Sequence, residues 1–215
     1  SLKGIRSKAV EENIDKIVLK GSQGQCGEGV VVLDFSEDQN LDTENHEFSD
    51  YDLMEEYIVQ HKELMRLSPS GLNTVRIFTQ IDSEGKVQLL GCRLRITVDS
   101  YVDNLAAGNL AAPINRETGI VVGPGVYSDI TKSDQSIHPI TGISIEGFQI
   151  PSWDETVELV KSAALFDTKN KSIGWDVAIT DRGPFLLEGN HNWCKLLWQL
   201  PVKKGLKNKL EAYLS

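Results

Sequence analysis

Short apolar runs rich in β-branched residues alternate with polar loops along the first half of the chain. Residues 17–20 and 29–35 flank a glycine-rich loop. Residues 74–81 and 86–97 form longer runs that are joined by Asp-Ser-Glu-Gly. Such runs, bounded by turn-forming residues, are typical of strands. We therefore expect two pairs of strands here, followed by long loops with short strands over residues 98–141.

The second half of the chain contains a helix signal and a hairpin signal. Ser152 and Glu155, three residues apart and followed by an apolar face, match a capping box and predict a helix that Ser152 caps. Residues 172–180 and 184–190 read as two strands separated by Asp-Arg-Gly, and a lysine-rich helix is expected after Pro201. Mixed antiparallel strands with a few helices make the predicted fold class α+β.

The hairpin at residues 172–190 carries the first candidate site. A three-residue turn at residues 181–183 would place Asp176 opposite Glu188, with Asn190 on the same face two residues on. Like charges across a strand pair destabilise a hairpin unless something neutralises them, so removing one carboxylate should leave the metal-free protein as stable or slightly more stable. Carboxylate and amide oxygens suit Mg²⁺ that bridges phosphates. The alternative is a pair of solvated surface carboxylates.

A glycine-rich loop at residues 21–29 is the second candidate. Its glycines, Gly24 and Gly27 among them, would let backbone N–H groups approach an anion closely, and Lys20 directly before the loop could neutralise phosphate. The loop matches neither the Walker nor the GxGxxG pattern. A plain hairpin connection with an exposed edge lysine explains it as well.

Three arginines lie within apolar strand patterns. Arg76 is inside the run at residues 74–81, while Arg93 and Arg95 share one face of the following run. A buried guanidinium needs an anionic partner, which a ligand or a structural salt bridge supplies equally well.

Composition narrows the function classes. The net charge of −9 makes the chain a poor candidate for nucleic-acid binding, which usually needs a basic stripe. No run approaches the roughly 18 apolar residues of a membrane span. Three widely spaced cysteines indicate reduced thiols and a cytoplasmic protein. Four tryptophans leave open a sugar-binding platform, although core packing is the commoner role of such side chains.

Taken in order, these segments resemble the ATP-grasp superfamily, most closely its sugar-transfer-associated family from bacterial polysaccharide loci. The resemblance covers residues 16–199. It rests on KIVLKGSQGQCGEGVVVLDF, DLMEEYIVQH, LNTVRIFTQ, GCRLRITVDSYVDNLAAGN, GFQIPSW and the pair GWDVAIT and PFLLEGN. It implies an ATP-grasp fold with a small lid lobe at residues 1–58 and a larger lobe at residues 59–215. The two lobes would sandwich ATP.

The resemblance also implies roles for individual residues. These are Lys20, Gly24 and Gly27 for phosphate; Glu55, Tyr57 and Ile58 for adenine; Arg76, Arg95 (or Arg93) and Asn104 for the reacting groups; and Asp176, Glu188 and Asn190 for Mg²⁺. The implied reaction activates a carboxylate as an acyl phosphate, which an amine then attacks. Both substrates would be small molecules, and the cofactors ATP and Mg²⁺. A phosphotransferase that acts on a hydroxyl, and a non-catalytic module that binds sugar or Ca²⁺, are the alternatives.

The sequence departs from the family pattern at three points. Gly21 follows Lys20 where a proline is usual, and the final asparagine is followed by His-Asn-Trp-Cys, whereas other ligases often have Pro-Gly there. The N-terminal domain of the superfamily, which helps to bind the acceptor, has no counterpart in this sequence. We therefore expect the acceptor site to be built differently or to lie outside these 215 residues.

Overall fold

A computed structural model of the protein describes most of the chain. The described residues are 7–9, 11–12, 14–21, 30–35 and 51–213. The chain divides into two compact units, Ser1–Ile58 and Val59–Ser215. Each unit contains its own antiparallel sheet, and the fold is α+β as predicted.

The first unit contains a three-stranded sheet in the order β2-β1-β3. Its strands are β1 (Lys16–Lys20), β2 (Val31–Asp34) and β3 (Leu53–Glu56). Alternate residues point to the same face of a strand, and here Ile17, Leu19 and Leu33 form a small buried cluster. The strands at both ends of the glycine-rich loop were thus predicted from the sequence.

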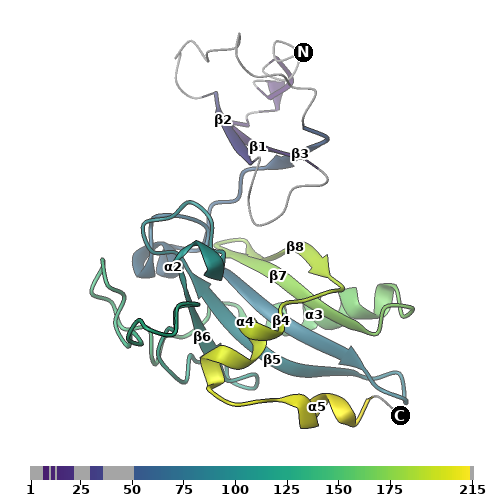
Figure 1. Ribbon diagram of the computed structural model, residues 1–215. Coiled ribbons are helices and arrows are strands. Elements are labelled where there is room, and N and C mark those ends of the chain that lie inside the picture. Colours follow the sequence, from purple (N-terminus) through teal and green to yellow (C-terminus); the bar gives the residue numbers. More distant parts are fainter. Residues whose placement is uncertain (1–6, 10, 13, 22–29, 36–50, 214–215) are drawn as a thin grey trace. The chain divides into compact units, whose positions relative to one another are not determined.

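The second unit is built on a five-stranded sheet in the order β6-β5-β4-β7-β8 (Figure 1). Its strands are β4 (Thr74–Ile81), β5 (Val87–Ile96), β6 (Leu110–Ile114), β7 (Ser172–Thr180) and β8 (Gly183–Asn190). Every residue of the central strand β4 is buried, as expected of a strand with neighbours on both sides and both faces covered. The polar residues of β4 therefore need partners inside the protein.

Helices cover the two faces of this sheet (Figure 1). They are α2 (Lys62–Leu67), α3 (Trp153–Phe166), α4 (Lys195–Gln199) and α5 (Lys207–Glu211), with 3-10 turns η2 (Leu105–Ala107) and η3 (Leu200–Val202). Helices α2 and α3 pack on the main core face. The segment from α4 to α5 packs on the other face around Phe78, Trp193 and Trp198. This second segment covers one end of its face, and the candidate site lies toward the other end.

The hairpin turn is shorter than the sequence analysis predicted. Thr180 pairs with Gly183, so only Asp181 and Arg182 form the turn, and Gly183 has a φ of 112° that favours glycine. A register shift after Asp176 leaves one extra residue in β8 and restores the predicted register beyond it. The predicted turn was wrong, whereas the predicted pairing of Asp176 with Glu188 is confirmed.

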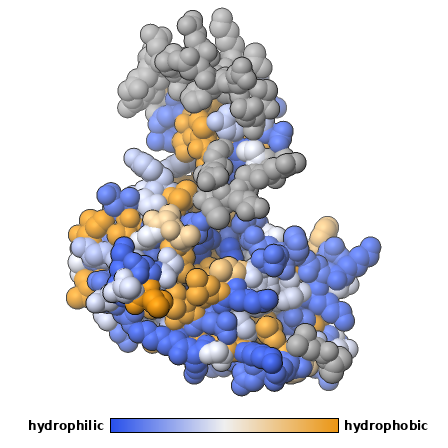
Figure 2. All heavy atoms as spheres, viewed as in Figure 1, coloured by the Kyte–Doolittle hydropathy of each residue, from blue (hydrophilic) through white to orange (hydrophobic). Residues whose placement is uncertain are grey.

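Two further expectations concern the helix cap and the tryptophans. Ser152 precedes α3 as predicted, but its side chain accepts no capping hydrogen bond because its backbone is left-handed, with a φ of 49°. All four tryptophans are buried in the two cores, so they form no exposed sugar platform. Figure 2 shows a largely hydrophilic surface on the visible face of this unit, with hydrophobic side chains in separate patches.

Candidate active site

A row of charged side chains crosses the second sheet. Arg93 on β5 pairs with Arg76 on β4, Arg76 pairs with Asp176 on β7, and Asp176 pairs with Glu188 on β8. Residues directly opposite one another across strands point to the same face. The register therefore brings four predicted site residues, which are far apart in the sequence, onto one face.

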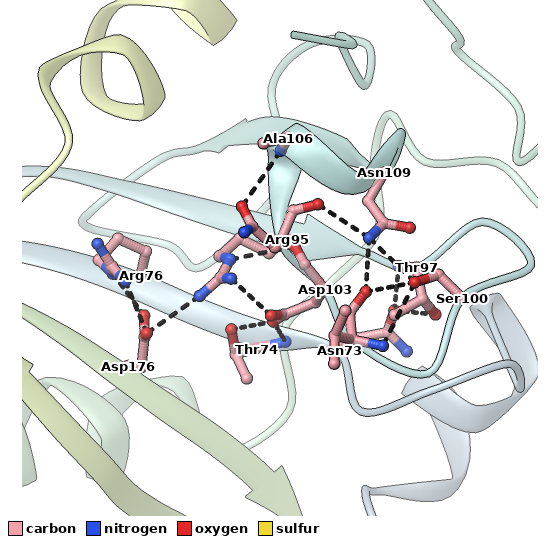
Figure 3. A network of polar contacts seen from close by, with 12 residues as sticks. Asn73, Thr74, Arg76, Arg95, Thr97, Ser100, Asp103, Ala106, Asn109 and Asp176 are labelled. Atoms are coloured by element: carbon pink, nitrogen blue, oxygen red, sulfur yellow. Dashed lines mark hydrogen bonds and ion pairs between the residues drawn. The ribbon is translucent and has the colours of Figure 1, made fainter. Parts of the chain in front are cut away.

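Asp176 is the centre of this row. Its Oδ1 accepts a hydrogen bond from Nε of Arg76, and its Oδ2 accepts bonds from Nη2 of Arg76 at 2.6 Å and Nη1 of Arg95 at 3.0 Å. Figure 3 shows the carboxylate between the two guanidinium groups. Asp176 is only 4% exposed and Arg76 6%. The acidic partner that a buried arginine requires is therefore this carboxylate.

Arg95 bridges Asp176 to a second carboxylate, that of Asp103. Its Nη2 lies 2.7 Å from Oδ1 of Asp103, and its Nε donates to the Asp103 carbonyl oxygen at 3.2 Å. The backbone N–H of Thr74 donates to the other carboxylate oxygen at 3.0 Å, and the Thr74 hydroxyl also bonds there. Two carboxylates and two guanidinium groups thus alternate in one group, in which all but Arg95 are buried. We call it the arginine–aspartate cluster: Arg76, Asp176, Arg95 and Asp103.

The two aspartates of this cluster have opposite pKa shifts. Burial acts to raise the pKa of Asp176, but hydrogen bonds from Arg76 and the charges of Arg95 and Arg76 outweigh it and hold the pKa below its usual value. Burial raises the pKa of Asp103, because Arg95 and Thr74 offset it only in part and the charge of Asp176 adds to it. The difference follows from the number of partners, since Asp176 has two arginines and Asp103 has one.

Buried amide side chains position the loop that carries Asp103 (Figure 3). Asn109 accepts from the N–H of Val98 at 2.8 Å and donates to the carbonyl oxygens of Val102 at 2.5 Å and Asn104 at 2.9 Å. At the start of β4, Asn73 accepts from the N–H of Thr97 at 2.8 Å. These bonds replace a regular strand ladder and hold the loop against the end of the sheet.

Glu188 and Asn190 form the accessible end of the charged row. Glu188 is exposed, and Nδ2 of Asn190 donates to it at 3.0 Å and to the carbonyl oxygen of Gly174 at 3.4 Å. With Asp176 directly opposite Glu188, two carboxylates and one amide oxygen meet at this edge, a donor set that suits Mg²⁺. The described residues contain no group of three or more His, Cys, Asp or Glu side chains that could hold a metal ion, at this edge or elsewhere, so a metal here would depend on two carboxylates and one amide.

The side chains of Arg93 and Asn104, the other predicted residues of this unit, are near the cluster but bond to other groups. Arg93 is nearly fully buried, but it donates to the carbonyl oxygens of Cys92 at 2.7 Å and of Trp198. Burial, with no acidic partner among the described residues, lowers its pKa to about 10. Asn104 caps η2, accepting from the N–H of Ala106 at 3.2 Å. Of the two arginines on β5, Arg95 is therefore the one that joins Arg76 at Asp176.

The predicted residues of the first unit are only partly described. Nζ of Lys20 lies 2.5 Å from Oε2 of Glu55, so these two predicted residues form an ion pair across β1 and β3. Tyr57 and Ile58 follow the end of β3. Nζ of Lys16 lies over the Tyr57 ring, 5.6 Å from the ring centroid. Gly24 and Gly27 lie outside the described residues.

Sequence reasoning missed the roles of Asp103, Thr74, Asn73 and Asn109. The only signal available was an acid beside the predicted Asn104, and acids in polar loops are common.

A groove of about 640 Å³ between α2 and the loop before α3 contains none of the predicted site residues. It is lined by His61, Glu63, Arg66, Phe148 and their neighbours. Within the described part of the chain, no helix combines the length and apolar character that a membrane crossing needs.

Comparisons with known proteins bear on these observations. The model of a family described as "Sugar-transfer associated ATP-grasp" matches residues 4–213. Among solved structures, the chain is similar to D-alanine–D-alanine ligase from Bacillus anthracis, with 15% identity and a TM-score of 0.41, over 86% of this chain and 46% of that one. No curated protein matches the sequence. Because the family model spans almost the whole chain, the protein belongs to the sugar-transfer associated ATP-grasp family.

Proposed function

We propose that this chain is the nucleotide-binding and catalytic part of an ATP- and Mg²⁺-dependent ligase that joins a carboxylate to an amine. Membership of the ATP-grasp family supports the use of ATP. The observation that carries the proposal is the pair of arginines, Arg76 and Arg95, held at the Asp176–Glu188 edge of the sheet. Cations next to hard oxygen donors are what a metal-bound polyphosphate requires.

The proposed reaction has two steps. A substrate carboxylate oxygen attacks the γ-phosphorus of ATP, so that an acyl phosphate forms and ADP leaves. The nitrogen of the amine then attacks the acyl carbon, phosphate leaves, and the nitrogen loses a proton. Both steps build negative charge on oxygen atoms, and no covalent bond to the protein is needed.

The residues of the chain would position and neutralise the reacting groups. Arg76 and Arg95 would bind phosphate oxygens, with Asn104 near the transferring group. Lys20 would neutralise the β- and γ-phosphates from the first unit, where Glu55, Tyr57 and Ile58 would contact adenine. Asp176, Glu188 and Asn190 would hold Mg²⁺, which would supply positive charge to offset that of the phosphate oxygens.

The cellular role is part of the same proposal. We propose that the substrates are small, sugar-linked carboxylates and amines, and that the protein acts in the cytoplasm in the synthesis of cell-surface polysaccharides. The description of the matched family as associated with sugar transfer supports a sugar-linked substrate.

Two measurements test the proposed function. Calorimetry with a non-hydrolysable ATP analogue should show binding that is tighter with Mg²⁺ than with EDTA, and absence of heat at millimolar ligand would exclude the ATP assignment. Hydroxylamine added to reactions with ATP and a panel of carboxylates should then trap a hydroxamate, because only an acyl phosphate yields one. A phosphorylated hydroxyl product without hydroxamate would identify a phosphotransferase instead.

A further inference from the structure

Both carboxylate oxygens of Asp176 are occupied by arginine donors. Oδ1 accepts from Nε of Arg76, while Oδ2 accepts from Nη2 of Arg76 and Nη1 of Arg95. A cation that approached Asp176 in this state would meet two guanidinium groups. Glu188, the other carboxylate of the pair, is exposed and accepts from Asn190. The two proposed metal-binding carboxylates are therefore unequally available.

The two arginines are also unequal. Arg95 has a second acid, because its Nη2 lies 2.7 Å from Asp103 and its Nε donates to the Asp103 carbonyl oxygen. Within the described part of the chain, Arg76 makes ion pairs with Asp176 alone. If Asp176 turns to another partner, Arg95 keeps its contacts with Asp103, whereas Arg76 loses every charged partner.

Burial makes each half of this exchange costly by itself. A metal on Asp176 alone would leave Arg76 as a buried cation without an anion, and an anion on Arg76 alone would leave Asp176 with only Arg95. Breaking one partner of a buried pair is strongly unfavourable because the other charge stays uncompensated. When metal and anion arrive together, both charges are matched again.

We infer that Asp176 exchanges Arg76 for the metal while Arg76 exchanges Asp176 for a phosphate oxygen, with Arg95 keeping Asp103 through Nη2 and Nε and turning only its Nη1 from Asp176 to phosphate. This inference rests on the proposed function and adds to it a coupled exchange of ion-pair partners at the site. The consequence is coupling: metal strengthens anion binding and the anion strengthens metal binding by the same factor. In the ligand-free protein the Arg76–Asp176 pair blocks both subsites.

The test compares two variants that each remove one negative charge from the same row. Asp176→Asn frees Arg76, and Glu188→Gln leaves the Arg76–Asp176 pair intact. The affinity of each protein for ADP and for a non-hydrolysable ATP analogue is measured by calorimetry in EDTA. We expect Asp176→Asn to bind at least about fivefold more tightly than wild type without metal, in line with ordinary coupling between sites. Glu188→Gln should gain less than about twofold, since an exposed charge is well screened.

Direct observation of the arginines covers the case in which Asp176→Asn does not fold. The Nε–H resonances of Arg76 and Arg95 in the wild-type protein can be assigned with Arg76→Lys and Arg95→Lys. On addition of Mg²⁺ and the ATP analogue together, the Arg76 resonance should shift strongly and that of Arg95 much less. Neither should shift strongly with Mg²⁺ alone.

The outcomes separate the exchange from the proposed function. If wild type binds the Mg²⁺–nucleotide complex but Asp176→Asn gains no more than Glu188→Gln, the exchange is wrong and the nucleotide site stands. An unshifted Arg76 resonance at saturation has the same meaning. If wild type binds no nucleotide under any condition, the proposed function itself fails and the exchange fails with it.

Discussion

Arg76 and Asp176 lie directly opposite each other on strands β4 and β7, and the guanidinium of one donates two hydrogen bonds to the carboxylate of the other. This ion pair reduces the repulsion that was expected between the opposed carboxylates of the hairpin, and so changes the expected effect of removing one of them on the free energy of unfolding. Asp176 faces Glu188, but two arginines already neutralise Asp176 without any metal. The expectation that loss of one carboxylate leaves the metal-free protein as stable, or more so, is therefore corrected for Asp176.

Asp176→Asn should lower the free energy of unfolding of the metal-free protein by about 3–5 kcal/mol, the usual cost of removing one partner from a buried ion pair. Arg76, which is buried, and Arg95, which is partly exposed, lose their shared counter-charge in this variant. Chemical denaturation followed by fluorescence measures the change. Glu188→Gln and Asp181→Asn are the controls, because both carboxylates are exposed, and each should have a much smaller effect. An unchanged midpoint for Asp176→Asn would show that the arginines do not depend on this carboxylate.

The pairing of Asp176 with Glu188 illustrates how far the sequence determines the structure. The alternation of apolar and polar residues placed both carboxylates on one face, and the strands were predicted correctly. The two-residue turn and the compensating register shift were not predicted, because a bulge depends on how β7 and β8 fit the whole sheet. Here two local errors cancelled.

The partner of the arginines was harder to predict than the arginines themselves. An arginine within an apolar strand indicated a buried charge, but any of the acids in the chain could have matched it. Asp103 reaches Arg95 only because Asn109 and Asn73 fold the intervening loop against the sheet. Such contacts are made by polar side chains that follow no periodic pattern in the sequence, so the pattern of hydrophobic residues does not predict them.

The two buried aspartates should take up protons in a defined order during acidification without metal. The pKa of Asp103 is raised, by burial that Arg95 offsets only in part, and that of Asp176 is lowered. Asp103 should therefore titrate above 3.8 and Asp176 below it, as followed by carboxyl carbon NMR. The stabilising contribution of Asp176 is present above pH 3.8 and is lost as pH falls through its folded pKa, whereas that of Asp103 is lost as pH rises through its own. The reverse order of titration would contradict the unequal sharing of arginines.

Asn109→Ala should loosen the loop that carries Asp103. The variant leaves the N–H of Val98 and the carbonyl oxygen of Val102 without their partner, which costs roughly 1–3 kcal/mol of unfolding free energy for buried groups. Hydrogen exchange at residues 98–104 should accelerate together with this loss. Asn115→Ala is the matched control, because the Asn115 side chain accepts from the backbone N–H groups of Glu117 and Thr118 in an exposed turn. Equal effects of the two variants would mean that the loop is held by other contacts.

Arg76 and Arg93 differ in their partners, and their variants should therefore differ in nucleotide affinity. Arg93→Met removes hydrogen bonds to the carbonyl oxygens of Cys92 and Trp198, but it also removes a buried cation that pairs with no acid in the described part of the chain. Arg76→Met instead takes the main partner from Asp176. Calorimetry with Mg²⁺ and an ATP analogue should therefore find near wild-type affinity in Arg93→Met and at least about a tenfold loss in Arg76→Met, because charged hydrogen bonds contribute roughly 1.5–3 kcal/mol each. Circular dichroism verifies that both variants fold. A loss in Arg93→Met as large as that in Arg76→Met would move the phosphate-binding arginine of β5 from Arg95 to Arg93.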